Sequence, residues 1–517
     1  MTDTPTDVDV LVVGGGPSGL TVAAEIAASG ASVRVLEKRS ADPISRAGTL
    51  LPRPLELFDA RDIADRFIRR TCEINPHPFQ TWHIWGGMHP VDWSSRESRF
   101  RFTLFLPQHE TELILRGWAT EQGVDLRFGN EVTDLAQSDG GVTVTSTDPH
   151  GLTRTTRARY VVGADGGQSA VRRLSGIDFE GRDATFTGII ADAELEFPWQ
   201  GGLRVGHNEH GWLTTFLFGP GLTRFTVVHA EGRAKAKSEP VTADEVARYV
   251  SEILEEQVRI PVLRGASRYT DAQRIAARFQ HGRVFLVGES ARIHYPASGI
   301  GMNYCLQDAF NLGWKIGAVL GGFADESLLD TYESERRPIS LDLLRTVDVQ
   351  VAIQFDFSPE GLALTSALQE HFLTLPDVTA RLHLELNGLE SRYPCEPGSH
   401  PQVGRPVADF ELMLRDGHSI RLYELLHDQH FVLIDISGTR ALRDVEFPGM
   451  PIRLVEAHPV RRPPALDGVT MLLVRPDTYL AWASVVSPSV ETARAQVSRW
   501  LREQNDFHPA TAAMTEK

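Results

Sequence analysis

The chain has 517 residues, of which 42% are hydrophobic and 23% are charged, so it is long enough to bury two or three sizeable cores. Its formal net charge of −16 argues against nucleic acid or an anionic membrane as a partner, because both are themselves negative. The sequence shows neither a signal-peptide pattern nor an apolar run of membrane length, which predicts a cytoplasmic protein. Its three cysteines have no CxxC or His-rich spacing, which predicts no metal site.

The first predicted element is an apolar strand from residue 8 that runs into a glycine-rich turn and a helix. Gly14 allows a tight turn, Gly16 lets the backbone approach a pyrophosphate, and Gly19 lets the helix pack close to the sheet. Glu37 ends the second strand, where an acid accepts the ribose hydroxyls of an adenosine and repels a 2′-phosphate. The pattern therefore predicts FAD or NAD rather than NADP. The expected contacts are Gly14, Gly16, Pro17, Ser18, Gly19, Glu37 and Lys38.

Two later segments indicate that the dinucleotide is a flavin. A predicted strand over 160–163 runs into Asp165, and another over 283–287 runs into Glu289, which places both acids to accept ribityl hydroxyls. The backbone N–H groups of 299–303 are expected to face the N1 and O2 edge of the ring. The sequence therefore predicts an FAD site made of three separated segments. The contacts expected from the two later segments are Asp165, Gly288, Glu289, Pro296, Gly299, Gly301, Met302 and Asn303.

Taken together, these segments resemble the class A flavoprotein monooxygenases, the aromatic hydroxylases with a p-hydroxybenzoate hydroxylase-like fold. Residues 45–47 and 53–56 resemble the family's segment under the flavin, 106–108 its Pro-Gln stretch, and 332–338 the end of a long helix. The resemblance implies a flavin-side role for Arg46, Arg53 and Gln108. Gly288–Glu289–Ser290–Ala291–Arg292 departs from the family's Gly-Asp-Ala-Ala-His, so the ribityl contact is expected to be rearranged or to run through water.

The resemblance also implies an α/β fold with three parts: a Rossmann-like FAD-binding domain, a β-sheet substrate domain and a C-terminal thioredoxin-like domain. We expect the FAD-binding domain over 1–180 plus 282–393, and the substrate domain over 181–281 with contributions from 75–100. The thioredoxin-like domain is expected over 394–517; it lacks CxxC and ends in a helix over 490–503. The candidate substrate residues are Trp82, Trp212, Phe216, Phe218 and His294. Among them, Trp212, Phe216 and Phe218 share one face of a predicted strand, because side chains two apart on a strand point to the same side.

The resemblance implies an FAD-dependent monooxygenase that uses NAD(P)H and O₂ to hydroxylate a phenolic or quinonoid aromatic substrate through a C4a-hydroperoxyflavin, with a polycyclic polyketide preferred. Because the flavin carries this chemistry, no catalytic side chain is assigned. The chain has no second Rossmann fingerprint, so NADPH, expected over NADH, docks transiently. Two alternatives stay open: Baeyer–Villiger oxygen insertion on the same scaffold, and a flavin-dependent reductase without oxygen transfer. A homodimer is the assembly considered.

Overall fold

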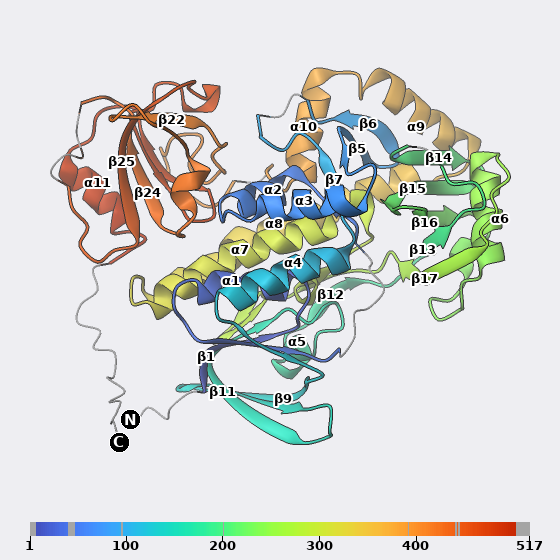
Figure 1. Ribbon diagram of the computed structural model, residues 1–517, viewed down its shortest axis with the longest axis horizontal. Helices are drawn as coiled ribbons and strands as arrows, with labels where there is room; N and C mark the ends of the chain where they lie inside the picture. The colour runs from blue at the N-terminus through green and yellow to red at the C-terminus, as the bar shows by residue number, and fades with distance from the viewer. Residues whose placement is uncertain are drawn as a thin grey trace.

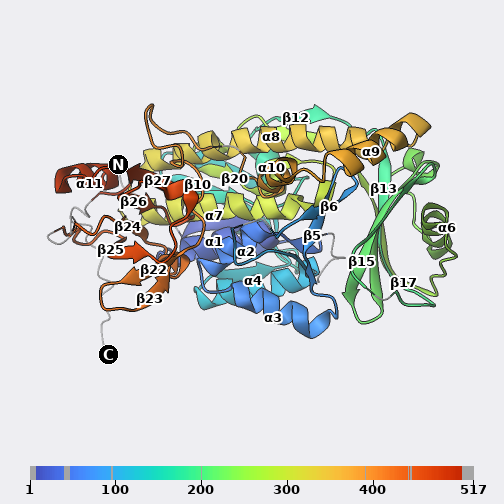
Figure 2. The same cartoon turned by 90° about the horizontal axis from the view of Figure 1, so that it is seen from above.

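The structure is a computed structural model that describes residues 7–39, 47–94, 97–199, 201–390, 392–439, 442 and 445–502. A central α/β unit separates an antiparallel sheet at one end of the long axis from a C-terminal sheet at the other (Figure 1, Figure 2). The predicted α/β class is therefore confirmed. None of the helices in the described ranges is both long and apolar enough to cross a membrane.

The central unit contains a sheet whose main strand order is β19-β20-β11-β1-β2-β8, with the β9–β10 hairpin added along β11. Five of its strands pair in parallel, and β1 is buried on both faces, as its continuous apolar sequence predicts. The strands are β1 (Val8–Val13), β2 (Val33–Glu37), β8 (Asp125–Phe128), β9 (Glu131–Ser138), β10 (Gly141–Thr147), β11 (Thr153–Gly163), β19 (Gln280–His281) and β20 (Val284–Leu286).

Helices α1 (Pro17–Ala27), α4 (Gln108–Glu121) and α7 (Gly301–Leu320) form a layer over this sheet (Figure 1). Gly313 of α7 allows α1 to approach closely, because a Cβ there would lie 2.3 Å from the Cβ of Glu25. The remaining helices of this region are α2 (Pro52–Asp59), α3 (Ala64–Ile74) and α5 (Ala170–Leu174). The close α1–α7 pair brings the N-terminal ends of two helices to the same edge of the sheet.

The sheet at one end of the long axis is antiparallel throughout, with the strand order β14-β15-β16-β13-β17. Its outer face is covered by α6 (Ala243–Leu254), a helix that the sequence analysis did not anticipate in this strand-rich segment (Figure 2). The covering buries Leu213 on one face of β15, whereas Trp212, Phe216 and Phe218 are buried against other clusters. The strands are β13 (Thr187–Glu194), β14 (Arg204–Asn208), β15 (Gly211–Gly219), β16 (Leu222–His229) and β17 (Val262–Thr270).

Short strands connect this sheet to the central unit. They form the β5–β6 hairpin and two three-stranded sheets of order β3-β7-β4 and β12-β18-β21. Their bounds are β3 (Thr49–Leu50), β4 (Phe79–Gln80), β5 (Trp82–Trp85), β6 (Met88–Asp92), β7 (Thr103–Phe105), β12 (Phe179–Arg182), β18 (Gln273–Ala276) and β21 (Arg292–Ile293).

Helix α8 (Asp330–Gln354) runs beside α7 and is followed by α9 (Pro359–His371) and α10 (Pro376–Leu386). The segment 332–338 was expected to end a long helix, and this expectation is wrong because Pro338 lies inside α8. Beyond Pro338, Ile339, Leu343 and Val347 are buried at helical spacing. Burial of this apolar stripe outweighs the one hydrogen bond that proline cannot make.

The C-terminal unit has a sheet of order β23-β22-β25-β24-β26-β27, in which β24 and β25 are parallel and β26 and β27 antiparallel. Its last described helix is α11 (Val490–Val497), which is shorter than the expected helix over 490–503. The strands are β22 (Glu411–Leu414), β23 (Ser419–Arg421), β24 (Phe431–Asp435), β25 (Ile452–Pro459), β26 (Met471–Val474) and β27 (Leu480–Ser484).

Candidate flavin and substrate site

The turn between β1 and α1 is built by backbone contacts that only glycine permits. Gly14 has φ +108°, and a Cβ there would lie 2.3 Å from the carbonyl oxygen of Ala164. A Cβ on Gly19 would lie 1.9 Å from the carbonyl oxygen of Gly14. Gly16 differs, because no atom lies within 4 Å of its Cβ position. The space beside Gly16 is therefore open to an approaching ligand.

The N-terminus of α1 borders this space. Gly16 is the N-cap and provides no side-chain hydrogen bond, so the first N–H groups of the helix are available to an anion. Gly288 has φ +67°, and a Cβ there would lie 2.7 Å from the Ser18 Oγ. The structure thus brings the second predicted segment against the first, with Glu289 exposed at the rim. An open glycine face and an uncapped helix end fit a dinucleotide diphosphate, whereas a rim carboxylate fits hydroxyl groups.

Glu37 ends β2 and is buried beside the turn. Its Oε2 accepts the backbone N–H of Gly15 at 2.7 Å, and its Oε1 accepts the backbone and side-chain N–H groups of Arg39, each at 2.8 Å. Burial opposes ionisation of Glu37, but the hydrogen bonds from Arg39 and Gly15 lower its pKa overall. Glu37 is therefore an ionised acceptor at neutral pH, as a ribose contact requires.

Asp165 has contacts with α5 that the sequence analysis did not foresee. Its carboxylate accepts the hydroxyl of Ser169 and the backbone N–H groups of Ala170 at 2.7 Å and Val171 at 3.1 Å. These bonds satisfy the first turn of α5, and contact of Asp165 with a ribityl hydroxyl stays a prediction. Burial raises the pKa of Asp165, although the same hydrogen bonds oppose that rise.

The segment from Pro296 to Asn303 joins a short 3-10 turn over Ala297–Gly299 to the N-terminus of α7. Ser298 and Gly299 both have positive φ, at +48° and +63°. The side chain of Asn303 accepts the N–H of Leu51 at 2.8 Å and donates to the carbonyl oxygens of Thr49 and Gly299. The Asn303 side chain therefore holds residues 49–51 against Gly299. The uncapped N–H groups at the start of α7, including those of Gly301 and Met302, are free to face a ligand.

The four remaining cofactor predictions have different outcomes. Gln108 begins α4, and its side-chain oxygen accepts the backbone N–H of Ala47 at 3.1 Å. This bond holds the residues before β3 against the start of α4. Arg53 is directed elsewhere: its guanidinium donates to Thr478 Oγ1 at 2.7 Å and to the carbonyl oxygen of Asp477 at 3.1 Å, in the C-terminal unit. Its expected flavin-side role is not what these contacts support. Lys38 is exposed, and Arg46 lies outside the described residues.

The candidate substrate residues fall into two aromatic groups. Phe216 stacks on Phe105 with ring centroids 4.6 Å apart, and Phe218 contacts Phe216 at 5.1 Å. A Cβ on Gly48 would lie 2.1 Å from the Phe218 ring, so Phe218 lies directly on the backbone beside β3. Trp212 and Trp82 belong to a separate cluster that includes Tyr295, the residue before the flavin-facing loop. Both groups thus adjoin segments expected to hold the flavin.

Two histidines lie against the same loop. His294 Nδ1 is 2.6 Å from the carbonyl oxygen of Tyr295, and its ring packs near Gly301. His83, which the sequence analysis did not single out, has Nε2 at 2.7 Å from the carbonyl oxygen of Ser298. Burial lowers the pKa of each histidine to about 4, although these hydrogen bonds oppose the shift. Both rings are therefore neutral at pH 7.

Residues 7–347 match the model of the family described as "FAD binding domain", and residues 400–503 match the one described as "Aromatic-ring hydroxylase, C-terminal". The chain belongs to the FAD-dependent aromatic-ring hydroxylases. The predicted class of flavin monooxygenase with NAD(P)H as reductant is confirmed, and so is the mixed α/β fold of the FAD-dependent aromatic hydroxylases.

This hydroxylase is 36% identical over 506 residues to the 12-dehydrotetracycline 5-monooxygenase/anhydrotetracycline 6-monooxygenase of Streptomyces rimosus, covering 95% of this chain and 98% of that protein. It is 34% identical to a rifampicin monooxygenase of Streptomyces venezuelae, covering 92% and 95%. The structure of the OxyS anhydrotetracycline hydroxylase from Streptomyces rimosus is similar, with 34% identity, a TM-score of 0.83 and coverage of 96% and 99%. The structure of CabE, an aromatic hydroxylase from angucycline biosynthesis, has 32% identity, a TM-score of 0.84 and coverage of 96% and 100%.

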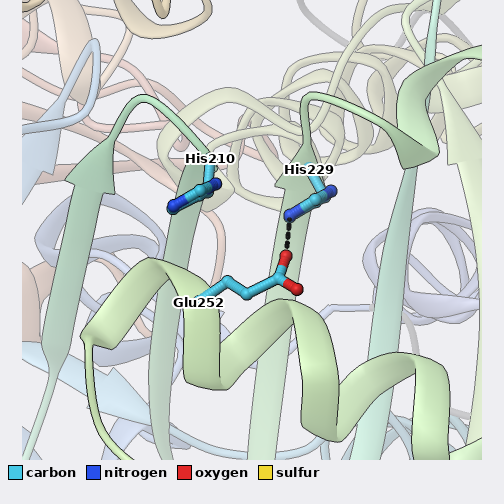
Figure 3. Close-up of side chains that lie close together, drawn as sticks. All are labelled: His210, His229 and Glu252. Atoms are coloured by element: carbon cyan, nitrogen blue, oxygen red, sulfur yellow. Dashed lines mark hydrogen bonds and ion pairs between the residues drawn. The ribbon is translucent and has the colours of Figure 1, made fainter.

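Among the residues that the structure describes, one group of possible metal ligands lies at the antiparallel sheet and α6, and the sequence analysis did not foresee it. Figure 3 shows His210, His229 and Glu252, whose ligand atoms lie within 4.8 Å of one another. His229 Nδ1 accepts the N–H of Glu231 at 3.2 Å, so Nε2 carries the proton and donates to Glu252 at 2.8 Å. Metal ligation by Nε2 needs the opposite tautomer. These hydrogen bonds therefore describe a structural pair and not a set of metal ligands.

Proposed function

We propose that this hydroxylase acts on a polycyclic aromatic polyketide that carries a phenol or quinone. The observation that carries the proposal is the aromatic surface of β15, which adjoins both segments expected to flank the flavin ring. A strand rises about 3.3 Å per residue, so Trp212 and Phe218 lie about 20 Å apart along β15. A surface of that length matches several fused rings better than a single phenol. The names of the tetracycline and angucycline relatives support the same substrate class.

FAD, when bound, supplies the activation of O₂ and accepts the hydride of NAD(P)H. The chain's own residues hold and shield the reactants. The N-terminus of α1 stabilises the diphosphate, and Glu37 accepts ribose hydroxyls. The first turn of α7 offers N–H groups to the ring edge. The buried aromatic side chains of β15 exclude water, and the neutral rings of His83 and His294 add no charge beside the loop.

Three finer points belong to the same proposal. We infer NADPH rather than NADH as the preferred reductant, O₂ as the second substrate, and a homodimeric assembly in the cytoplasm. Reductant preference is measured as kcat/KM with each nucleotide, and assembly by light scattering of the FAD-loaded protein at several concentrations. Cell fractionation with an antibody against the chain tests the compartment.

The function is tested by NADPH oxidation in air with a panel of single-ring phenols, naphthoquinones and tetracyclic phenols, with product masses read in parallel. We expect tetracyclic substrates to accelerate oxidation at least tenfold and to gain one oxygen as a hydroxyl group. A lactone or ester product would mean Baeyer–Villiger insertion, and reduced substrate without added oxygen would mean a reductase. Acceleration by single-ring phenols alone would refute the polycyclic assignment.

The variant Trp212→Ala tests the surface itself. It shortens the aromatic face, so KM for a tetracyclic substrate should rise about tenfold while KM for a single-ring substrate changes less than twofold. Trp199→Ala is the matched control, because Trp199 packs against Phe225 in the cluster between the sheet and α6. Equal changes in both variants would show that the sheet responds as a whole and that Trp212 does not select the substrate.

A further inference from the structure

The C-terminal domain inserts one buried loop into the flavin-binding domain. This loop, Arg475–Tyr479, connects β26 and β27, and Arg475, Asp477, Thr478 and Tyr479 are each at most 3% exposed. Arg475 donates to Asp477 at 2.9 Å and 2.6 Å, which closes the loop on itself. Thr478 has φ +68°, a backbone conformation that β-branched residues rarely adopt. Such strain persists only where surrounding contacts hold it.

The partner of Thr478 across the domain boundary is Arg53. The guanidinium of Arg53 donates to the Thr478 hydroxyl at 2.7 Å and to the carbonyl oxygen of Asp477 at 3.1 Å, and its side chain is 1% exposed. It also forms an ion pair with Glu56 at 3.3 Å. Because this guanidinium is fully buried, each of its bonds is costly to lose. The geometry of the loop therefore fixes where Arg53 can lie.

Arg53 ends a short segment that reaches the flavin-facing loop directly. Two residues before it, the N–H of Leu51 donates to Asn303 Oδ1 at 2.8 Å. Asn303 Nδ2 in turn donates to the carbonyl oxygens of Thr49 at 3.2 Å and Gly299 at 3.0 Å. A continuous set of buried contacts thus leads from Thr478 through residues 49–53 to the start of α7.

A second set of contacts from the same loop reaches the other half of α7. Arg475 binds Glu335 of α8 at 2.6 Å and 2.9 Å, and Glu335 binds Lys315 of α7 at 2.7 Å. Burial opposes ionisation of Glu335, but the positive charges of Arg475 and Lys315 lower its pKa to about 2. Asn311 of α7 also donates to Asp477 at 3.3 Å. The loop therefore contacts α7 directly at Asn311 and reaches Lys315 through Glu335, in addition to its contact with Arg53.

We propose that Thr478 of the C-terminal domain is a positioning residue for the flavin site, acting through Arg53 and residues 49–53 on the loop 299–303. The C-terminal domain then does more than stabilise the chain. It sets the placement of the backbone N–H groups that face the flavin ring, although none of its own residues needs to touch FAD.

The test is the variant Thr478→Val, which keeps the side-chain shape and removes the hydroxyl that Arg53 binds. We expect the dissociation constant for FAD, measured by fluorescence titration of the apoprotein, to rise about tenfold and the visible absorption band of the bound flavin to shift. Thr478→Ser restores the hydroxyl and should restore both values. The thermal midpoint of each apoprotein is measured in parallel, so that weaker FAD binding is not confused with loss of fold.

Arg421→Gln is the matched control. Arg421 also joins the two domains, through an ion pair with Asp59 at 2.6 Å, but Asp59 is the last residue of α2 and lies outside the 49–53 segment. We expect this variant to bind FAD within twofold of the natural chain. If Arg421→Gln weakens FAD binding as much as Thr478→Val does, general docking of the domain explains the effect and the proposal fails.

A double-variant cycle separates this indirect role from direct contact of Arg53 with FAD. Arg53→Lys keeps the charge but loses the forked geometry that reaches both Thr478 and the Asp477 carbonyl. If Arg53 acts through Thr478, the double variant that combines Arg53→Lys with Thr478→Val should bind FAD no more weakly than Arg53→Lys alone. Additive losses, or natural FAD affinity and spectrum in Thr478→Val, would overturn the proposal.

Discussion

The two ends of the flavin site are held in different ways. We expect the adenosine end within residues 14–37, a segment shaped by backbone contacts such as the Gly19 position against the Gly14 carbonyl oxygen. We expect the ring end at the loop 296–303, which is held by side chains from distant parts of the chain: His83, Gln350 and, through residues 49–53, Thr478. The first end is a property of a short sequence, whereas the second is a property of the whole fold.

The largest expected effect tests how strongly the fold depends on the interdomain contacts. Arg475→Met removes the positive partner of Glu335 and Asp477, which are both buried. Loss of one partner of a buried pair costs about 3–5 kcal/mol, so the free energy of unfolding in urea should fall by that amount. Arg66→Met is the control, because the side chains of the Arg66–Glu121 pair are 39% and 52% exposed and such a pair is worth about 1 kcal/mol or less. Similar losses in the two variants would mean that the buried network is no stronger than a surface pair.

A somewhat smaller effect is expected in acid at the ring end. The pKa of His83 is about 4 in the folded protein, against an ordinary value of 6.5. Between these values the unfolded chain binds the extra proton, so stability falls as pH decreases from 6.5 to 4, by roughly 3 kcal/mol for one histidine. His83→Gln should make urea unfolding less sensitive to pH in this window, whereas the exposed His418→Gln should not. If the free energy of unfolding depends on pH equally in His83→Gln and in the natural chain, burial of His83 does not lower its pKa and the prediction is wrong.

The third prediction concerns the adenosine end alone. Gly16→Val places its Cβ in the open space beside α1, where no protein atom lies within 4 Å. FAD affinity should therefore fall at least about 100-fold, or about 2.7 kcal/mol, while the thermal midpoint of the apoprotein stays unchanged. Gly117→Val, on α4 with equally open space, should leave both values alone. Normal FAD binding by Gly16→Val would place the diphosphate elsewhere.

The sequence predicted what is determined locally and missed what is determined by packing. Gly14, Gly16 and Gly19 were placed because the strand, turn and helix occur within one short segment. The contacts of Asp165 with the first turn of α5 were missed, although the sequence 165–169, acid to serine before a helix, was an available signal. Arg53 and His83 had no such signal, since their partners lie in residues 477–478 and 298. The spacing of a motif cannot report a contact between segments so far apart.

The insertion of the middle sheet between β11 and β20 has a consequence for synthesis of the protein. These two strands pair in parallel in the central sheet, yet the entire middle sheet is translated between them. While that insertion emerges from the ribosome, the end of β11 is an unpaired edge, a position prone to wrong pairing. The start of α7 follows β20, so the nascent chain carries the adenosine end long before it can form the ring end. The segments predicted to hold the two ends of the cofactor therefore cannot come together until more than half of the polypeptide has been made.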